Sequence, residues 1–528
     1  MIRQIFLALG ALTAFHLAAG SGIASDAASC PVPAAEAPAP DMRTKLLAHF
    51  ISALTEKDPD QQCLKLIDVI AMAPDDAEAP FAAFQTAFSK AKDRKKILEK
   101  FDSIQNRSPR HPLLVLHAVA LHRACGAKAE VLLKKAAFLL ESTPAKLMAT
   151  ASWDPGCTST LYHCAALAMI ETGNYEKLPA LFKKWENAPY PHKVAVHLAF
   201  AEPCFVAAAR AYALNKTALA KDLEKCFQQA LTTFEVAQKL TPDRKRDAGI
   251  LLFYTKFKPL FPGKAIEFAR NYDTRVNSAE SNYWLMNTAW KCGSIKDLDK
   301  AVAGINEMNP RFNAADLRVK CFINAKNFAE AAKELKKVPE EKRLELQILL
   351  YSAKKVWKGL YAFLSERLSK GTAPDLHTGV LLLSIAEHLG DKNIFYQGLK
   401  IIAPQLHVPE LANAAGYISA VLGIELPRAR QLLAGALKQQ PRNAAFLDSM
   451  AWIAFKEKRF AEAEKWINKA FHHMLPNEGV AVIFEHAGDI AAAQGKSPLP
   501  YYRLSLKYAA FDNEFEKETV LKKMKAFK

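Results

Sequence analysis

The chain has 528 residues, half of them apolar and only 21 of them glycine. This composition supplies ample core material and favours an all-α protein over a β-rich one. The formal net charge of +17 predicts acidic partners, such as acidic polymer or an anionic lipid surface, although scattered lysines with nearby Glu also fit a solvated helical surface. Nucleic acid is not an expected partner, because the N-terminus predicts export.

The N-terminus has the three regions of a secretory signal peptide. Arg3 precedes an apolar run from Ile5 to Ala19, and small residues follow up to Ala24. We place signal cleavage after Ala24, with Gly20 as the alternative position. Residues 1–24 would thus be removed, and no transmembrane segment is expected in the mature chain.

A Pro/Ala-rich segment at residues 25–41 predicts an extended linker. Cys30 within it lies beyond Asp26 and lacks a leucine three residues upstream. These features favour a linker cysteine over a lipid-modified one. The protein is therefore expected in the periplasm or secreted, with association with the outer membrane as an alternative.

Nine cysteines leave at least one thiol unpaired within an exported chain. None of them forms a Cys-x-x-Cys pair, and we predict no metal or cofactor. Neighbouring helices could bring together one group of cysteine and histidine residues. This group could be a metal site, a set of buried apolar cysteines or the location of one disulfide. Its members are His122, Cys125, Cys157, His163 and Cys164.

Residues 42–259 predict helical hairpins of irregular length. Apolar residues recur there at helical spacing between Pro-containing turns. The longest predicted helices are Val194–Leu214 and Leu219–Leu240, and no stretch after the signal predicts a membrane span. We interpret this region as the divergent N-terminal part of a repeat stack.

Residues 260–511 predict a regular array, because two markers share one period. The predicted inter-helix turns are 31 to 37 residues apart, at Gly293, Lys326, Trp357, Gly390, Gly423, Lys458 and Gly495. One proline per repeat marks where a helix must stop, at Pro310, Pro339, Pro374, Pro404, Pro441 and Pro476. A polar helix at residues 512–528 would cap the end of this stack.

The clearest repeat is residues 441–475, which predict two amphipathic helices joined by a tight turn. Small residues at Ala451, Ala463 and Ala470 would let the two helices approach closely, and Leu447 and Ile467 complete the pattern. This stretch resembles a tetratricopeptide repeat. The resemblance implies a right-handed α-solenoid of antiparallel helix pairs, and in such proteins the first helix of each pair lines a concave binding face.

Transferred to this chain, the resemblance implies a peptide-binding groove rich in aromatic, Lys and Asn side chains. For the aromatic members, packing between adjacent repeats is the alternative. The predicted groove residues are Tyr283, Asn287, Trp290, Lys291, Lys320, Asn324, Tyr351, Lys354, Lys355, His388, Asn413, Tyr417, Asp448, Trp452 and Lys456.

No nucleophile-turn, phosphate-loop, zinc-protease or dinucleotide motif is present in the sequence. The nearest arrangement is Glu485, His486 and Asp489, which the repeat pattern explains. We therefore predict a non-enzymatic protein-binding scaffold of the bacterial cell envelope. The alternatives are a protein that binds polyanions or polysaccharides, and a hydrolase of cell wall or glycans with its site in residues 42–260.

The signal-peptide prediction can be tested directly. The exported chain should begin at Ser25, because signal peptidase cuts after small residues. Intact mass of the protein from the periplasmic fraction would show this. An N-terminus at Met1 in that fraction would contradict it.

Overall fold

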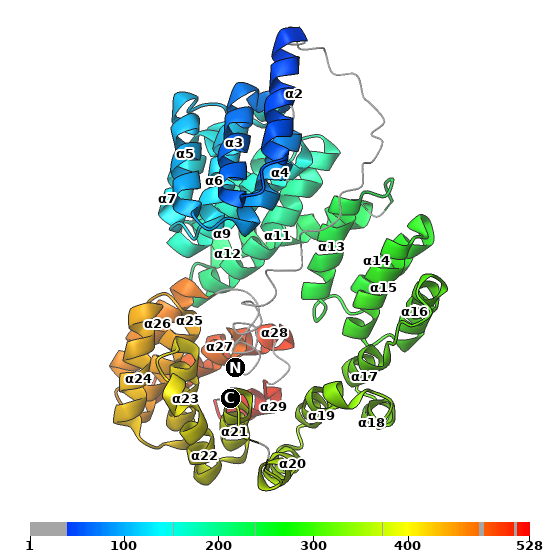
Figure 1. The fold of residues 1–528 in the computed structure, drawn as a ribbon. Coiled ribbons are helices and arrows are strands. Elements are labelled where there is room, and N and C mark those ends of the chain that lie inside the picture. Colours follow the sequence, from blue (N-terminus) through cyan, green and yellow to red (C-terminus); the bar gives the residue numbers. More distant parts are fainter. Residues whose placement is uncertain are drawn as a thin grey trace. The chain divides into compact units, whose positions relative to one another are not determined.

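The computed structural model describes residues 40–150, 153–237, 239–371, 373–474, 480–511 and 515–527. Within these ranges every regular element is a helix (Figure 1). Successive helices pack together as hairpins, which confirms the predicted all-α solenoid. The predicted signal peptide, linker residues 25–39 and Pro476 lie outside the described residues.

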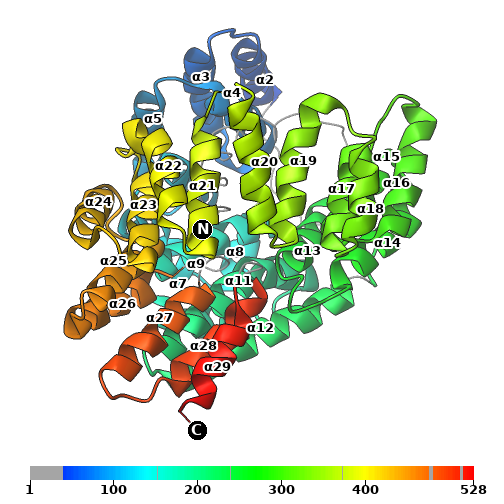
Figure 2. The same cartoon turned by 90° about the horizontal axis from the view of Figure 1, so that it is seen from below.

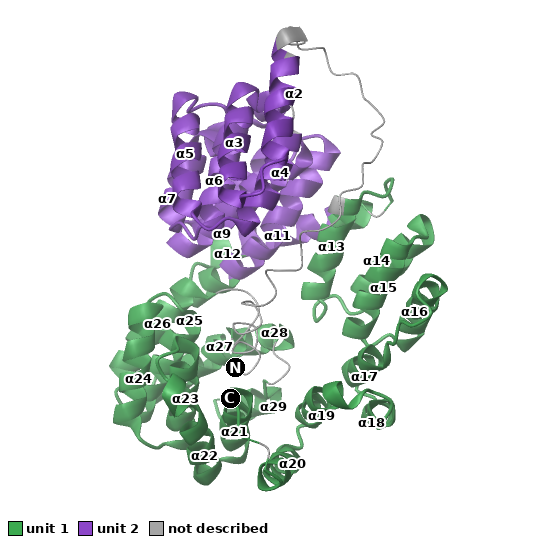
Figure 3. Ribbon diagram, in the orientation of Figure 1, with its two compact units in different colours: residues 1–8, 209–220, 234–528 green, residues 9–208, 221–233 purple. Residues whose placement is uncertain are grey.

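The chain divides into two compact units, which are treated separately (Figure 3). Among the described residues, unit 2 holds residues 40–150, 153–208 and 221–233, and unit 1 holds residues 209–220 and the described residues from 234 onward. The predicted boundary between residues 259 and 260 falls inside unit 1.

Unit 2 contains the irregular hairpins and most of two long helices, α11 and α12. Its N-terminal core is built around Phe84 and Phe101, which are nearly inaccessible to solvent. The elements are α2 (Pro40–Leu54), α3 (Pro59–Met72), η1 (Pro74–Asp76), α4 (Glu78–Lys90), α5 (Arg94–Arg107), α6 (Pro112–Ala124), α7 (Ala129–Glu141), α8 (Pro144–Met148), α9 (Pro155–Thr172), η2 (Tyr175–Lys177), α10 (Leu178–Lys184), α11 (Tyr190–Ala213) and α12 (Thr217–Ala237).

Helix α11 is long and apolar enough to cross a membrane, with a mean hydropathy of 1.4 over its most apolar window. The sequence predicted a long helix here but no membrane span. In the fold, 83% of that window is buried, and Phe200 lies 5.4 Å from the ring of Tyr162 on α9. The apolar surface of α11 is therefore used in packing within the protein.

Unit 1 contains the regular array. Its elements are α13 (Arg244–Lys256), α14 (Lys264–Val276), α15 (Ala279–Cys292), α16 (Ile295–Met308), α17 (Ala315–Asn324), α18 (Phe328–Leu335), α19 (Glu340–Ala353), α20 (Trp357–Ser369), α21 (Leu376–Leu389), α22 (Lys392–Ile402), η3 (Ala403–Gln405), α23 (Pro409–Leu422), α24 (Leu426–Gln439), α25 (Ala444–Lys456), α26 (Phe460–His473), α27 (Val480–Ala493), α28 (Leu499–Tyr508), η4 (Ala509–Phe511) and α29 (Lys517–Lys525).

The inter-helix turns of the array use left-handed backbone. Glycine takes this conformation at no steric cost, and it does so at Gly293, Gly390, Gly423 and Gly495. Lysine takes it in three other turns, at Lys326, Lys355 and Lys458. Trp357, predicted to mark one turn, is instead the first residue of α20. Lys355, with φ of 55°, makes that turn.

Close approach of the two helices holds each hairpin together. In the repeat at residues 441–475, Ala451, Ala463 and Ala470 are fully buried, as the pattern predicted. Gly416 serves the same purpose between α23 and α24. A Cβ atom there would lie 2.1 Å from Leu433 Cδ2 and 3.1 Å from the Ala429 carbonyl oxygen.

The last helix, α29, packs against the end of the array. Val520 is fully buried, in a cluster with Tyr502 and Phe515. The Lys523 ammonium lies 2.7 Å from a Glu485 oxygen and 2.6 Å from an Asp489 oxygen. These contacts cover the apolar side of the last hairpin.

The tip of the α11–α12 hairpin and the C-terminal end of α13, both in unit 1, contact the last helices of the same unit, and Figure 2 shows the helices from below. Arg210, 1% exposed, donates from Nε to the Met474 carbonyl oxygen at 2.7 Å. The Lys507 ammonium lies 4.8 Å from the centroid of the Tyr212 ring. Phe257 and Phe511 pack edge to face with centroids 5.8 Å apart. The last helices of unit 1 are therefore in contact with the segments of unit 1 that precede the array.

The Gly416 contact yields a stability prediction. Gly416→Ala should destabilise the protein by about 1–3 kcal/mol, because Leu433 is buried and cannot yield. Urea unfolding, with hydrogen exchange of the α23 amides, measures this.

Gly435→Ala in α24 is the matched control, because a Cβ there has no neighbour within 4 Å. This variant should be neutral or more stable by up to about 1 kcal/mol. Equal destabilisation of both variants would contradict the close-approach interpretation.

Candidate functional site

Four predicted groove residues gather around Trp290, and we call this group the Trp290 site: Trp290, Lys291, Lys320 and Asn324. The ammonium groups of Lys291 and Lys320 lie 5.6 and 6.0 Å from the centroid of the indole ring. Asn324 donates its amide to the Trp290 carbonyl oxygen at 2.9 Å. The site joins the C-terminal ends of α15 and α17, the first helices of two neighbouring repeats.

The close fit of those two helix ends brings the site together. Gly293 ends α15 in left-handed backbone, and a Cβ there would lie 2.6 Å from the Ala325 amide nitrogen. Only a residue without a Cβ allows this approach. The indole Nε1 of Trp290 is buried and has no acceptor within the part of the chain that the structure describes.

A second group, the Trp452 site, contains Tyr417, Asp448, Trp452, Lys456 and His486. His486 of α27 stacks on the Trp452 indole with centroids 4.0 Å apart, and the Tyr417 ring lies 6.1 Å from the same imidazole. The Lys456 ammonium lies 5.1 Å from the centroid of the Trp452 ring. This site joins α23, α25 and α27, again the first helices of consecutive repeats.

His486 is the residue of this site that the sequence interpretation missed. Its Nδ1 lies 2.9 Å from an Asp448 carboxylate oxygen, and both side chains are buried. Burial alone would lower the pKa of His486, but the Asp448 carboxylate outweighs it and raises that pKa. An Asp in the middle of the apolar segment Phe446–Met450 was the available signal, because a buried carboxylate needs a partner.

Two predicted groove residues do not face solvent. Asp448 is 5% exposed because it pairs with His486, and Asn413 is 4% exposed on α23. The amide oxygen of Asn413 is buried without a hydrogen-bond donor among the residues described. The prediction that these two side chains line an open surface was wrong, because their helices pack on both sides.

The remaining predicted residues lie apart from the two tryptophan sites. Tyr351 packs inside its own hairpin against Phe363, with centroids 5.7 Å apart. His388 stacks on Trp357 at 3.9 Å, and the Lys355 ammonium pairs with Glu516.

Further residues of the prediction are on the surface. Lys354 is exposed, as is Tyr283, whose side chain is 57% exposed. The Asn287 amide donates within α15 to the Tyr283 carbonyl oxygen.

Four of the residues weighed for enzymatic or metal chemistry have structural partners. Glu485 and Asp489 pair with Lys523, and His486 pairs with Asp448. His122, from the proposed Cys/His group, contacts an Asp102 oxygen at 2.9 Å. Within the residues described, no group of three potential metal ligands occurs.

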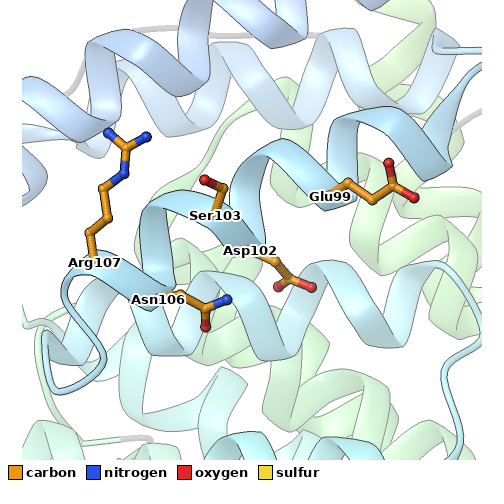
Figure 4. Close-up of a pocket in the computed structure, with 5 residues that line it drawn as sticks. All are labelled: Glu99, Asp102, Ser103, Asn106 and Arg107. Carbon is orange, nitrogen blue, oxygen red and sulfur yellow. The ribbon is translucent and has the colours of Figure 1, made fainter.

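A surface hollow in unit 2 contains two carboxylates, as a glycan hydrolase would require. It is lined by Glu99, Asp102, Ser103, Asn106 and Arg107, all on α5 (Figure 4). The Asp102 carboxylate is held by the Lys135 ammonium at 2.9 Å as well as by His122. The two acids therefore follow one helix and do not face each other across a cleft.

Comparison with known proteins supports the repeat type. No family model matches the chain. Over 204 residues it is 28% identical to a TPR repeat-containing protein of Pseudomonas aeruginosa, a match covering 36% of this chain and 34% of that protein. The chain resembles tetratricopeptide-repeat proteins. It spans about a third of the length of this relative.

Solved structures of helical repeat proteins are similar at low scores. Yeast Tom70 matches with 12% identity and a TM-score of 0.31, over 92% of this chain and 96% of that chain. The P58(IPK) TPR domain matches with 13% identity and a TM-score of 0.19, over 78% and 96%. The pentatricopeptide repeat protein PPR10, in complex with an RNA element, matches with 14% identity and a TM-score of 0.31, over 93% and 94%. No functional inference rests on these scores.

The His486–Asp448 pair predicts a pH dependence of stability. The pKa of folded His486 lies above the unfolded value of about 6.5, so the protonated form favours the fold. This contribution is complete below about pH 6.5 and is lost as the pH rises through the folded pKa. Urea midpoints of wild type and His486→Gln across this range would show the loss in wild type alone.

Two variants sharpen this measurement. Asp448→Asn should cost about 3–5 kcal/mol, because it leaves one member of a buried pair without its partner. His49→Gln, exposed on α2, should keep the wild-type pH dependence. A His486→Gln profile parallel to wild type would contradict the assignment.

Proposed function

We propose that this protein is a non-enzymatic binding scaffold of the bacterial cell envelope, exported to the periplasm or secreted, that assembles protein partners along the first helices of its array. One observation supports this most directly. Trp290 and Trp452 lie on two separate first helices, and each has a half-buried indole ring with lysine ammonium over it, two lysines at Trp290 and one at Trp452.

The chemistry of the two sites suits a peptide or helix. The Trp290 indole supplies stacking area, whereas the Trp452 indole already stacks on His486 and Phe455 and adds apolar surface. At both sites, neighbouring lysines attract carboxylates or backbone carbonyls of a ligand. The indole Nε1 atoms of Trp290 and Trp452 have no acceptor among the described residues. An unsatisfied buried donor costs about 1–3 kcal/mol, so a ligand carbonyl that accepted a hydrogen bond from one of these Nε1 atoms would gain binding energy.

A third tryptophan shows that this pattern is not general in the fold. Trp466, on the second helix α26, also has a lysine over its ring, with Lys469 Nζ 4.2 Å from the centroid. Its indole Nε1, however, donates to a Glu462 oxygen at 3.2 Å. Trp466 is therefore satisfied within the protein, whereas the two first-helix tryptophans are not.

We favour scaffolding over binding of a polyanion because several lysines are paired locally with carboxylates. Lys523 pairs with Glu485 and Asp489, and Lys300 lies 2.8 Å from Asp273. Pairs of this kind leave small groups of lysines beside aromatic rings. An acidic segment of a protein partner matches such groups better than a uniform polymer does.

Substitution of the two tryptophans tests the proposal. The mature chain captures partners from its own envelope fraction, and the affinity of each captured protein is then measured after purification. Trp290→Ala and Trp452→Ala should each weaken binding about 10- to 100-fold, as expected for aromatic residues central to an interface.

Trp466→Ala is the matched control, because it removes an indole with a lysine from a second helix. It should leave the affinity within about twofold of wild type. Circular dichroism verifies that all three variants fold. Equal affinities for the wild type and both first-helix variants would overturn the assignment of these sites.

A further inference from the structure

Two buried cysteines face each other across the longest helical hairpin. Cys204 on α11 is fully buried and Cys226 on α12 is 6% exposed, and both belong to unit 2. The hairpin turns at Asn215, which has left-handed backbone with φ of 57°. Each cysteine lies eleven residues from Asn215 in the sequence. In antiparallel helices, positions equidistant from the turn lie at the same level.

The helix faces around the two cysteines carry mostly small side chains. Residues three before and four after a position share its helical face. For Cys204 these are Ala201 and Ala208, and for Cys226 they are Leu223 and Ala230, all nearly inaccessible to solvent. Small side chains allow the close approach of backbones that a bridge between two Cα atoms requires.

Direct contacts show that the two helices meet at this level. Phe205 and Phe227, the residues that follow the cysteines, have ring centroids 5.2 Å apart. Both are free thiols in the structure. They are close enough to affect each other's ionisation, since each thiol shifts the pKa of the other, upward for Cys204 and downward for Cys226.

We propose that Cys204 and Cys226 form an intramolecular disulfide in the exported protein. The oxidant is the disulfide bond of a dithiol oxidase or of a small-molecule disulfide. One cysteine thiolate attacks a sulfur of the oxidant and releases its first thiol, giving a mixed disulfide. The second cysteine then attacks the protein-side sulfur and releases the second thiol. Two protein thiols are oxidised, and one oxidant disulfide is reduced to two thiols.

This bridge closes before the hairpin is packed, because both sulfurs are buried in the fold. The bridge joins the parts of α11 and α12 that belong to unit 2. The tip of the same hairpin, residues 209–220, belongs to unit 1. Of the nine cysteines in the sequence, seven remain, so the odd thiol expected of this chain is another residue.

Peptide mass spectrometry tests the bridge without any variant. Free thiols of the full-length chain, recovered from the periplasm, are alkylated in denaturant before digestion with trypsin. Residues 194–210 and 226–239 form separate tryptic fragments with one cysteine each. The expected result is a cross-linked pair of these fragments that disappears on reduction. Alkylation of both cysteines, or a link from either to a different cysteine, would overturn the proposal.

Experiments on purified protein test the bridge independently of export. When the reduced protein is refolded from denaturant in a glutathione redox buffer, the same pair should form as the buffer becomes more oxidising, because both thiols are accessible before the hairpin packs. Reduction should lower the melting temperature of wild type by about 5 °C, as for a bridge closing a loop of this length. Cys204→Ser/Cys226→Ser should show no such shift. Cys63→Ser, which changes another buried cysteine of unit 2, should keep it, and an unchanged shift in the double variant would contradict the proposal.

Discussion

Close approach between paired helices is the constraint on which the array depends. A repeat of two helices has too little surface to form a core of its own, so it must bury one face against its partner helix and another against the next repeat. A repeat can bury both faces only if its two helices lie close together. Ala451, Ala463 and Ala470 achieve this in one repeat and Gly416 in another, where the Leu433 side chain occupies the space of a missing Cβ.

The repeat period could be predicted from sequence because it depends on local chemistry. Glycine in left-handed turns and proline between helices act within a few residues, and these markers identified the hairpins. The turn near Trp357 was misplaced because Lys355 adopts left-handed backbone there. Left-handed backbone is unfavourable for lysine, so the residue type does not predict a turn at this position.

The composition of the candidate sites was harder to predict, because it depends on residues one repeat apart. The helical spacing of Trp452 and Lys456 placed them together correctly, since both belong to α25. Asp448 was expected in solvent, yet its partner His486 lies 38 residues later and removes it from the surface. Periodicity describes one helix at a time and therefore cannot show which face a later repeat will cover.

An open solenoid can lengthen or tighten like a spring, because each repeat contacts only its neighbours. In unit 1 such motion is restrained, because the tip of the α11–α12 hairpin and the end of α13 contact the last helices of the unit. Stretching it would pull the buried Arg210 guanidinium from the Met474 carbonyl oxygen and part Phe257 from Phe511. If the protein acts as the proposed scaffold, these contacts set much of its curvature before a partner binds, so that less binding energy is needed to change its shape.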